Sequence, residues 1–112
     1  MSKKILIVDD DPDIREILTY NLKKENYLVF TASNGKEALE KAQQLVPDLI
    51  LLDIMMPEMD GIETCQELRK LSTLNQTYIV FFVGQGGRSF LNWRHLMPVA
   101  MIILSNPSNL RC

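Results

Sequence analysis

Two acidic positions follow short apolar runs, and their spacing is the feature of this sequence that could do chemistry. The acidic run at residues 9–11 comes directly after residues 4–8, which read Lys-Ile-Leu-Ile-Val, and Asp53 comes directly after the apolar residues 49–52. Apolar runs bounded by polar or turn residues are typical of strands buried in a parallel sheet. Because the carboxyl ends of parallel strands meet at one edge, we expect these carboxylates to share one cleft.

Carboxylates placed so closely need a proton or a cation. Like charges a few ångströms apart repel by on the order of several kcal/mol in a partly buried site. Since all the ligands would be oxygens, the pattern favours Mg²⁺. With a cation present, Asp53 could attack phosphorus with a carboxylate oxygen and form an aspartyl phosphate. Asp11 precedes Pro12 and is interpreted as a helix N-cap. Asp9 and Asp10 are therefore the predicted catalytic partners of Asp53.

Strands and helices alternate along the first three-quarters of the chain and would position these residues. Strands are predicted at residues 4–8, 27–31, 49–52 and 78–83, and helices at 12–25, through 38–45, and from Gly61 with Ile62, Cys65 and Leu68 facing inward. Such alternation predicts right-handed βαβ crossovers. The predicted fold is α/β, a doubly wound parallel sheet of flavodoxin-like strand order 2-1-3-4-5.

Length and composition limit the possibilities. The 112 residues, 46% of them hydrophobic, fit a single globular domain. No signal peptide is recognisable, and no apolar stretch approaches the roughly 20 residues of a membrane span. We therefore expect a cytoplasmic protein without membrane contact.

The charges divide the chain into two unlike parts. All fourteen Asp and Glu lie between Asp9 and Glu67, so that residues 1–70 carry a net charge of −5 and residues 71–112 a net charge of +3. A protein surface normally mixes both signs, so the last 42 residues, which contain no acidic residue, differ in composition from the rest of the chain. They offer no basic recognition helix, and direct nucleic acid binding is not expected.

The acidic run 9–11 with its strand, and residues 48–61, which read Asp-Leu-Ile-Leu-Leu-Asp-Ile-Met-Met-Pro-Glu-Met-Asp-Gly, resemble the receiver domain of bacterial two-component response regulators. The resemblance runs through residues 1–82. The chain is thus predicted to be one receiver-like domain, 1–112, with a divergent tail at 83–112.

The resemblance implies a function and a set of site residues. Asp53 would be the phosphoacceptor, receiving a phosphoryl group from a sensor histidine kinase or a phosphotransfer protein. Asp10 and Asp53 would bind Mg²⁺ directly, with the backbone carbonyl of Met55, and Asp9 would act largely through water. Such a domain catalyses only its own phosphorylation and is not otherwise an enzyme.

The sequence departs from the receiver pattern near its end. The hydroxyl residue expected after the fourth strand falls on Val83, and the expected lysine falls near Ser105 and Asn106, whereas no lysine follows Lys70. The last helix is also expected to be lacking. Switching in response to phosphorylation is therefore expected to be impaired.

A frameshift would explain the divergent tail. When the codons for residues 95–112 are read one base earlier, compatible codon choices give a string that resembles a receiver's last strand and its Lys-Pro pair. We hypothesise a frameshift near residues 82–90, which the coding DNA would test. Residues 99–104 are still expected to form a fifth strand and residues 89–96 a helix, and the altered segment could promote self-association.

Three other functions fit parts of the pattern. A degenerate receiver would act as a phosphorylation-independent protein-interaction module. An aspartate-nucleophile phosphohydrolase would need a second Asp where Met55 stands. A flavin-binding module would need a phosphate loop after the first strand, where the acids at 9–11 would repel phosphate.

Overall fold

The computed structural model describes residues 2–82 and the backbone of residues 101–105. One sheet has five strands in the order β2-β1-β3-β4-β5. The strands are β1 (Lys4–Val8), β2 (Leu28–Ala32), β3 (Leu49–Asp53), β4 (Tyr78–Phe82) and β5 (Met101–Ser105). The helices are α1 (Pro12–Lys24), α2 (Gly35–Leu45), α3 (Gly61–Arg69) and the 3-10 helix η1 (Ser72–Leu74). The predicted doubly wound, flavodoxin-like strand order is confirmed.

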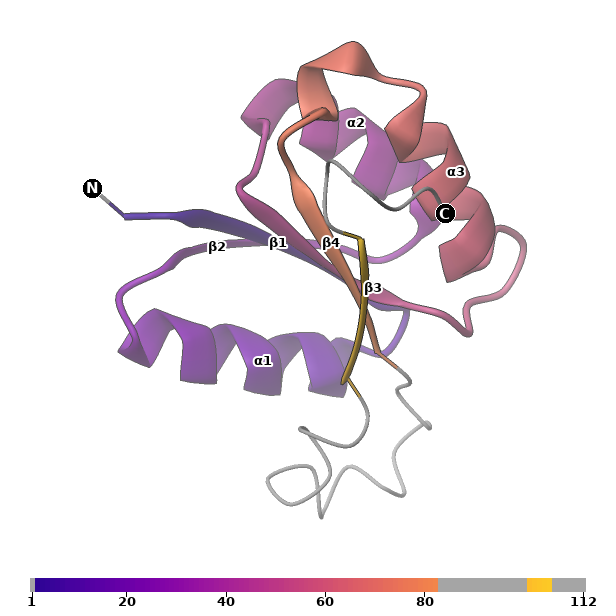
Figure 1. The fold of residues 1–112 in the computed structure, drawn as a ribbon. Coiled ribbons are helices and arrows are strands. Elements are labelled where there is room, and N and C mark those ends of the chain that lie inside the picture. The colour runs from indigo at the N-terminus through magenta and orange to yellow at the C-terminus, as the bar shows by residue number, and fades with distance from the viewer. Residues whose placement is uncertain (1, 83–100, 106–112) are drawn as a thin grey trace.

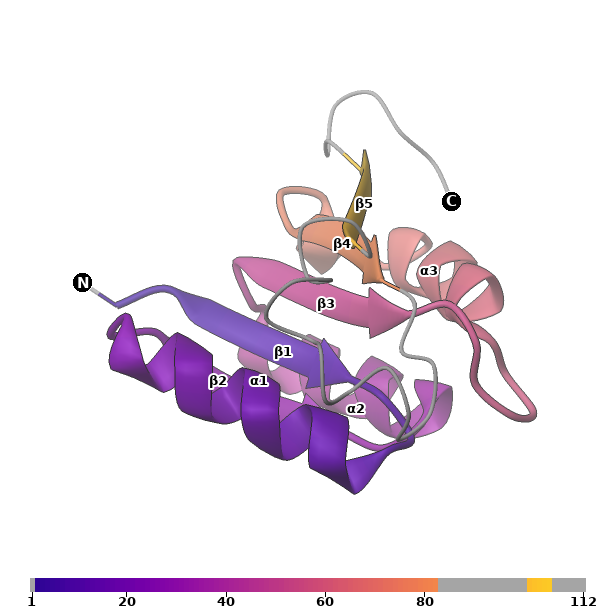
Figure 2. The same ribbon diagram turned by 90° about the horizontal axis from the view of Figure 1, so that it is seen from below.

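Helices cover both faces of the sheet. Helix α1 lies on one face, and α2 and α3 lie together on the other (Figures 1 and 2). In β1, Leu6 and Val8 point into the core beneath α2 and α3, whereas Ile5 and Ile7 point toward α1 and contact Leu18 in the other core. Burial of both faces explains the uninterrupted apolar runs, since each fully buried aliphatic side chain contributes about 1.5–3 kcal/mol.

Local sequence signals start the helices. Asp11 has an extended backbone, and its side chain accepts a hydrogen bond of 2.9 Å from the Asp13 N–H, as predicted for an N-cap. In α3 the prediction that Cys65 and Leu68 face inward is confirmed. The same prediction is wrong for Ile62, which is 37% exposed, because Gly61, Thr64, Cys65 and Leu68 make the buried stripe at i, i+3, i+4 and i+7.

Strand β5 runs in the direction opposite to the other four. Strands β1 to β4 are parallel, but β5 pairs antiparallel with β4, with Met101 opposite Phe82 and Ser105 opposite Ile79. The predicted fifth strand is thus found beside β4, whereas its predicted parallel direction is wrong. A strand that begins where β4 ends needs no crossover over the sheet, whereas a parallel strand does. The predicted helix at 89–96 and the predicted lack of a last helix concern residues outside those described.

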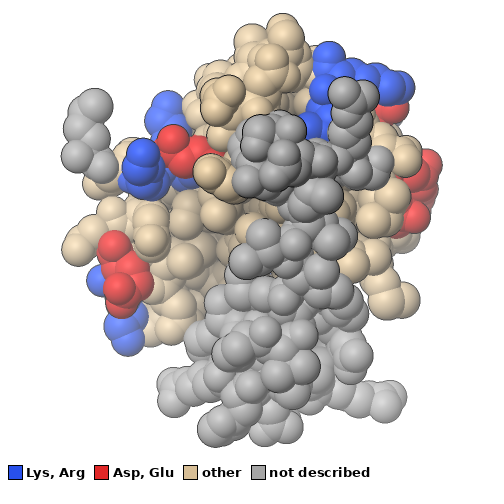
Figure 3. Space-filling view, viewed as in Figure 1, with Lys and Arg blue, Asp and Glu red and all other residues tan. Residues whose placement is uncertain are grey.

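The described part of the chain contains no helix that is long and apolar enough to cross a membrane. Its longest, α1, has 13 residues, against the roughly 20 that a span needs. On the face shown in Figure 3, acidic and basic side chains lie close to one another. This mixing of signs within the described residues agrees with the charge pattern of residues 1–70.

Candidate functional site

The structure brings Asp9, Asp10 and Asp53 together at the carboxyl edge of the sheet. Strands β1 and β3 are neighbours with Val8 opposite Leu52, so the residues that follow these two positions lie side by side. One carboxylate oxygen from each of the three aspartates lies within 4.8 Å of the others. Asp9 and Asp53 are each only 1% exposed, whereas Asp10 is exposed. The site is therefore open to solvent at one carboxylate and buried at two.

The Asp9 residue is fixed by its surroundings on three sides. Its N–H donates to the carbonyl oxygen of Ala32 at 3.1 Å, and its own carbonyl oxygen accepts from Nη1 of Arg15 at 2.7 Å. Its Oδ1 accepts from the Asp11 N–H at 2.8 Å. The remaining oxygen, Oδ2, is buried and has no hydrogen-bond partner among the described residues.

Burial and neighbouring charge make the ionised form of Asp9 unfavourable. The pKa of Asp9 is raised from its ordinary value to about 8, chiefly because burial removes solvent from the carboxylate. The negative charges of Asp53 and Asp10 also raise the pKa. The hydrogen bond from the Asp11 N–H acts in the opposite direction and lowers the pKa. A divalent cation between the carboxylates would offset both effects, because it stabilises the ionised form of a buried carboxylate.

The chain after β3 turns tightly around Asp53. The Met55 N–H donates to Oδ1 of Asp53 at 3.1 Å, and the Gly61 N–H donates to the carbonyl oxygen of Ile54 at 2.9 Å. A side chain on Gly61 would place its Cβ 2.3 Å from the carbonyl oxygen of Asp53, so only glycine fits there. The Met55 side chain is 67% exposed, and the metal-binding role of its carbonyl stays a prediction.

The residues present fit a divalent cation. All the donors are carboxylate oxygens, the donor type preferred by Mg²⁺. One buried oxygen of Asp9 lacks a hydrogen-bond donor among residues 2–82, and buried polar atoms are normally satisfied. A cation at this position would relieve the repulsion between the carboxylates, and a water bound to the cation would satisfy that oxygen.

Of the expected hydroxyl and lysine positions, the structure describes only the backbone of Ser105. Val83 and Asn106 lie outside the described residues. Ser105 lies opposite Ile79, three residues along β4 from Phe82, which pairs with Asp53. Because β5 is antiparallel, its first residue rather than its last lies at the edge that carries the acids.

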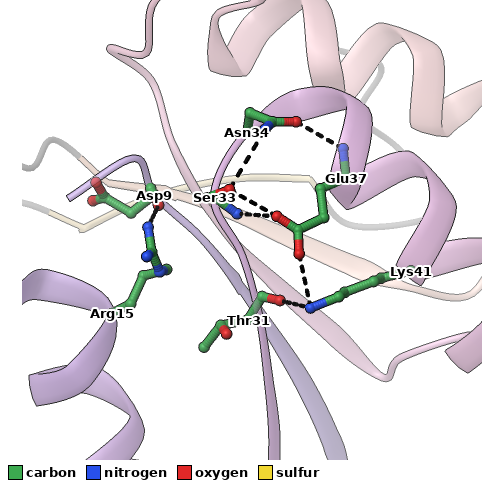
Figure 4. A network of polar contacts seen from close by, with 7 residues as sticks. All are labelled: Asp9, Arg15, Thr31, Ser33, Asn34, Glu37 and Lys41. Atoms are coloured by element: carbon green, nitrogen blue, oxygen red, sulfur yellow. Dashed lines mark hydrogen bonds and ion pairs between the residues drawn. The ribbon is translucent and has the colours of Figure 1, made fainter. Parts of the chain in front are cut away.

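One residue of this site and the network beside it were not predicted from the sequence. The Arg15 contact with the Asp9 backbone was not predicted, although a cation in the first turns of the helix after an acidic run could have suggested it. Nearby, the Glu37 carboxylate accepts from Ser33 and pairs with Lys41, which also donates to the carbonyl oxygen of Thr31 (Figure 4). This network joins β2 to α2.

Comparisons with known proteins agree with this geometry. PhoP of Bacillus subtilis, the transcriptional regulatory protein of alkaline phosphatase synthesis, is 56% identical over 70 residues, which cover 62% of this chain but only 29% of that protein. The chemotaxis protein CheY4 of Vibrio cholerae superposes with a TM-score of 0.74 at 30% identity, covering 96% of this chain and 92% of CheY4.

A further solved structure was determined with ligands bound. The response regulator TrrA of Thermotoga maritima, in complex with Mg²⁺ and BeF, has a TM-score of 0.63 and 39% identity, over 82% of this chain and 79% of TrrA. The family model of the response regulator receiver domain matches residues 5–107. Because this match covers most of the chain, the protein belongs to the receiver domains of two-component response regulators.

Proposed function

We propose that this domain accepts a phosphoryl group on Asp53 in the presence of Mg²⁺. The observation that carries the proposal is the placement of three carboxylates, two of them buried, within 4.8 Å of one another at adjacent strand ends. Asp10, Asp53 and the Met55 carbonyl would hold the cation, with Asp9 acting through water. When bound, Mg²⁺ supplies charge neutralisation and aligns the phosphoryl group with the attacking oxygen.

The transfer itself requires little of the protein beyond positioning. A carboxylate oxygen of Asp53 attacks phosphorus, a new P–O bond forms, and the P–N bond of a phosphohistidine breaks. The electron pair of that bond stays on the imidazole nitrogen. The Met55 N–H, bonded to Oδ1 of Asp53 at 3.1 Å, holds the carboxylate in one orientation during the attack.

Phosphorylation with a small-molecule donor tests the proposal. Incubation of the full chain with acetyl phosphate and Mg²⁺ is expected to add one phosphoryl group, seen by intact mass, and Asp53→Asn is expected to abolish the addition. Asp11→Asn is the matched control, since asparagine caps a helix as well as aspartate does. Phosphorylation that survives in Asp53→Asn would rule out Asp53 as the acceptor.

Membership of the receiver family supports an inference about the partner and the cellular location. Receiver domains act with histidine kinases or phosphotransfer proteins, and we infer a donor of this class and a cytoplasmic location. The segment aligned with PhoP spans less than a third of that protein, so transcriptional regulation is assigned to PhoP alone. Within residues 2–82 we infer no surface for direct nucleic acid binding.

A second candidate function is a phosphorylation-independent interaction domain. It is favoured by the absence of lysine after Lys70 in the sequence and by the place of Ser105 opposite Ile79, away from the edge that carries Asp53. Impaired switching would follow from the same features. If a partner binds wild type and Asp53→Asn with equal affinity, and binds equally well in EDTA and in Mg²⁺, this alternative is supported over phosphorylation-dependent signalling.

A further inference from the structure

Arg15 makes a side-chain contact with the backbone beside the acidic site. It lies in the first half of α1 and is half-buried. Its Nη1 donates a hydrogen bond of 2.7 Å to the carbonyl oxygen of Asp9, as Figure 4 shows. This cation therefore contacts the backbone of the acidic loop rather than the Asp9 carboxylate, and it leaves the carboxylate oxygens to the site.

The bond constrains the residue that carries the exposed carboxylate. The Asp9 carbonyl and the Asp10 N–H belong to the same planar peptide unit, so the direction of one fixes the direction of the other. With the Asp9 N–H already held by Ala32 at 3.1 Å, the Arg15 bond fixes the backbone on both sides of the Asp9 side chain. The orientation of Asp10 is limited in the same way.

We propose that Arg15 is a positioning residue for the phosphoryl-transfer site, holding the peptide between Asp9 and Asp10 so that both carboxylates face Asp53. The inference rests on the proposed function. Groups that orient metal ligands from outside the ligand shell typically change metal affinity by about 10–100-fold when they are removed. Arg15 meets this description, because it contacts the ligand-bearing backbone.

Mg²⁺ titration followed by the NMR shifts of the Asp10 and Asp53 amides tests the inference. Arg15→Met keeps the apolar length of the side chain but removes the donor, and it is expected to weaken Mg²⁺ binding about tenfold. Arg15→Lys keeps a cationic donor and is expected to recover part of the affinity. Lys23→Ala, which removes a cation from the same helix without a contact to Asp9, is expected to leave the affinity unchanged.

A metal-free measurement separates positioning from overall stability. In EDTA, the Asp10 amide is expected to exchange with solvent faster in Arg15→Met than in Lys23→Ala, while core amides such as that of Leu51 exchange equally in both variants. A general loss of protection in Arg15→Met, extending to Leu51, would show a merely structural role and overturn the inference.

The failures of the two proposals are distinguishable. Wild-type protein that binds no Mg²⁺ would overturn both the proposed function and the positioning role. Two results would overturn the positioning role alone, provided that the wild type binds Mg²⁺. One is an Mg²⁺ affinity of Arg15→Met within twofold of wild type, and the other is a loss of affinity in Lys23→Ala equal to that in Arg15→Met.

Discussion

Glu37 shows what a single carboxylate contributes when several donors surround it. Both the backbone N–H and the hydroxyl of Ser33 donate to Oε1 at 2.8 Å, and Nζ of Lys41 lies 2.9 Å from Oε2 (Figure 4). These donors lower the pKa of Glu37 to about 2, with the Ser33 N–H as the largest cause. The folded state therefore binds the Glu37 proton more weakly than the unfolded chain does.

This shift predicts a pH-dependent loss of stability in Glu37→Gln. Because the pKa of Glu37 is depressed in the folded protein, its stabilisation is fully present above the unfolded pKa and is lost as the pH falls toward about 2. The variant is expected to be less stable at pH 7 by about 1 kcal/mol or less, since the pair is partly exposed, and to approach wild type near pH 2. Urea unfolding at several pH values measures the difference.

Glu40→Gln provides the comparison at the residue scale. Glu40 is exposed on the same helix, so its replacement should change stability little at any of these pH values. A Glu37→Gln difference that stayed constant from pH 7 to pH 3 would contradict the assigned role of the carboxylate.

Among the structural elements, helices α2 and α3 both begin with glycine, but they differ in the atoms that a side chain at that glycine would meet. A Cβ on Gly61, the first residue of α3, would lie 2.3 Å from the carbonyl oxygen of Asp53 and 2.8 Å from Cα of Ile54. A Cβ on Gly35, the first residue of α2, would meet side-chain atoms of Thr64 and Met59 at 2.5 and 2.6 Å. Moving the backbone atoms around Gly61 costs more free energy than moving the flexible side chain of Met59 beside Gly35.

We therefore expect Gly61→Ala to destabilise the domain by about 1–3 kcal/mol and Gly35→Ala by less. The measurement is urea unfolding of both variants under the same conditions. Because Gly61 abuts Asp53, its replacement should also weaken Mg²⁺ binding, whereas Gly35→Ala should not. An equal or smaller loss for Gly61→Ala would show that the loop after β3 adjusts without strain.

Over the whole molecule, the acidic site opposes folding when no cation is bound. The raised pKa of Asp9 means that the folded protein holds a proton that the unfolded chain releases, so stability should fall as the pH rises from the ordinary aspartate pKa toward about 8. Ligands that bind only the folded state restore stability, and Mg²⁺ should do so here.

Melting temperatures test this balance. In EDTA at pH 7, Asp9→Asn is expected to melt roughly 5 °C or more above wild type, since 1 kcal/mol is worth roughly 4–8 °C in a domain of this size. Mg²⁺ should raise the melting temperature of wild type. Asp13→Asn, which removes an exposed acid from α1, serves as control. A lower melting temperature for Asp9→Asn in EDTA would contradict the proposed repulsion.

Much of this protein could be predicted from local patterns. Uninterrupted apolar runs predicted strands buried on both faces, and the order of alternation predicted the doubly wound sheet, because helical crossovers between parallel strands have one favoured hand. Asp11 was predicted as an N-cap from its own residue type and from the proline that follows it. The convergence of Asp9, Asp10 and Asp53 followed from the same topology, since residues after neighbouring parallel strands must meet at one edge.

Only the tertiary structure decided the remaining features, because they depend on pairings between segments that no local pattern encodes. The direction of β5 is set by its pairing with β4, and an apolar run reads the same in either direction. The exposure of Ile62 is set by which stripe of α3 meets the sheet. The position of Arg15 early in α1 suggests a contact with the acidic run, but which Asp9 atom it bonds depends on how α1 lies against the acidic loop.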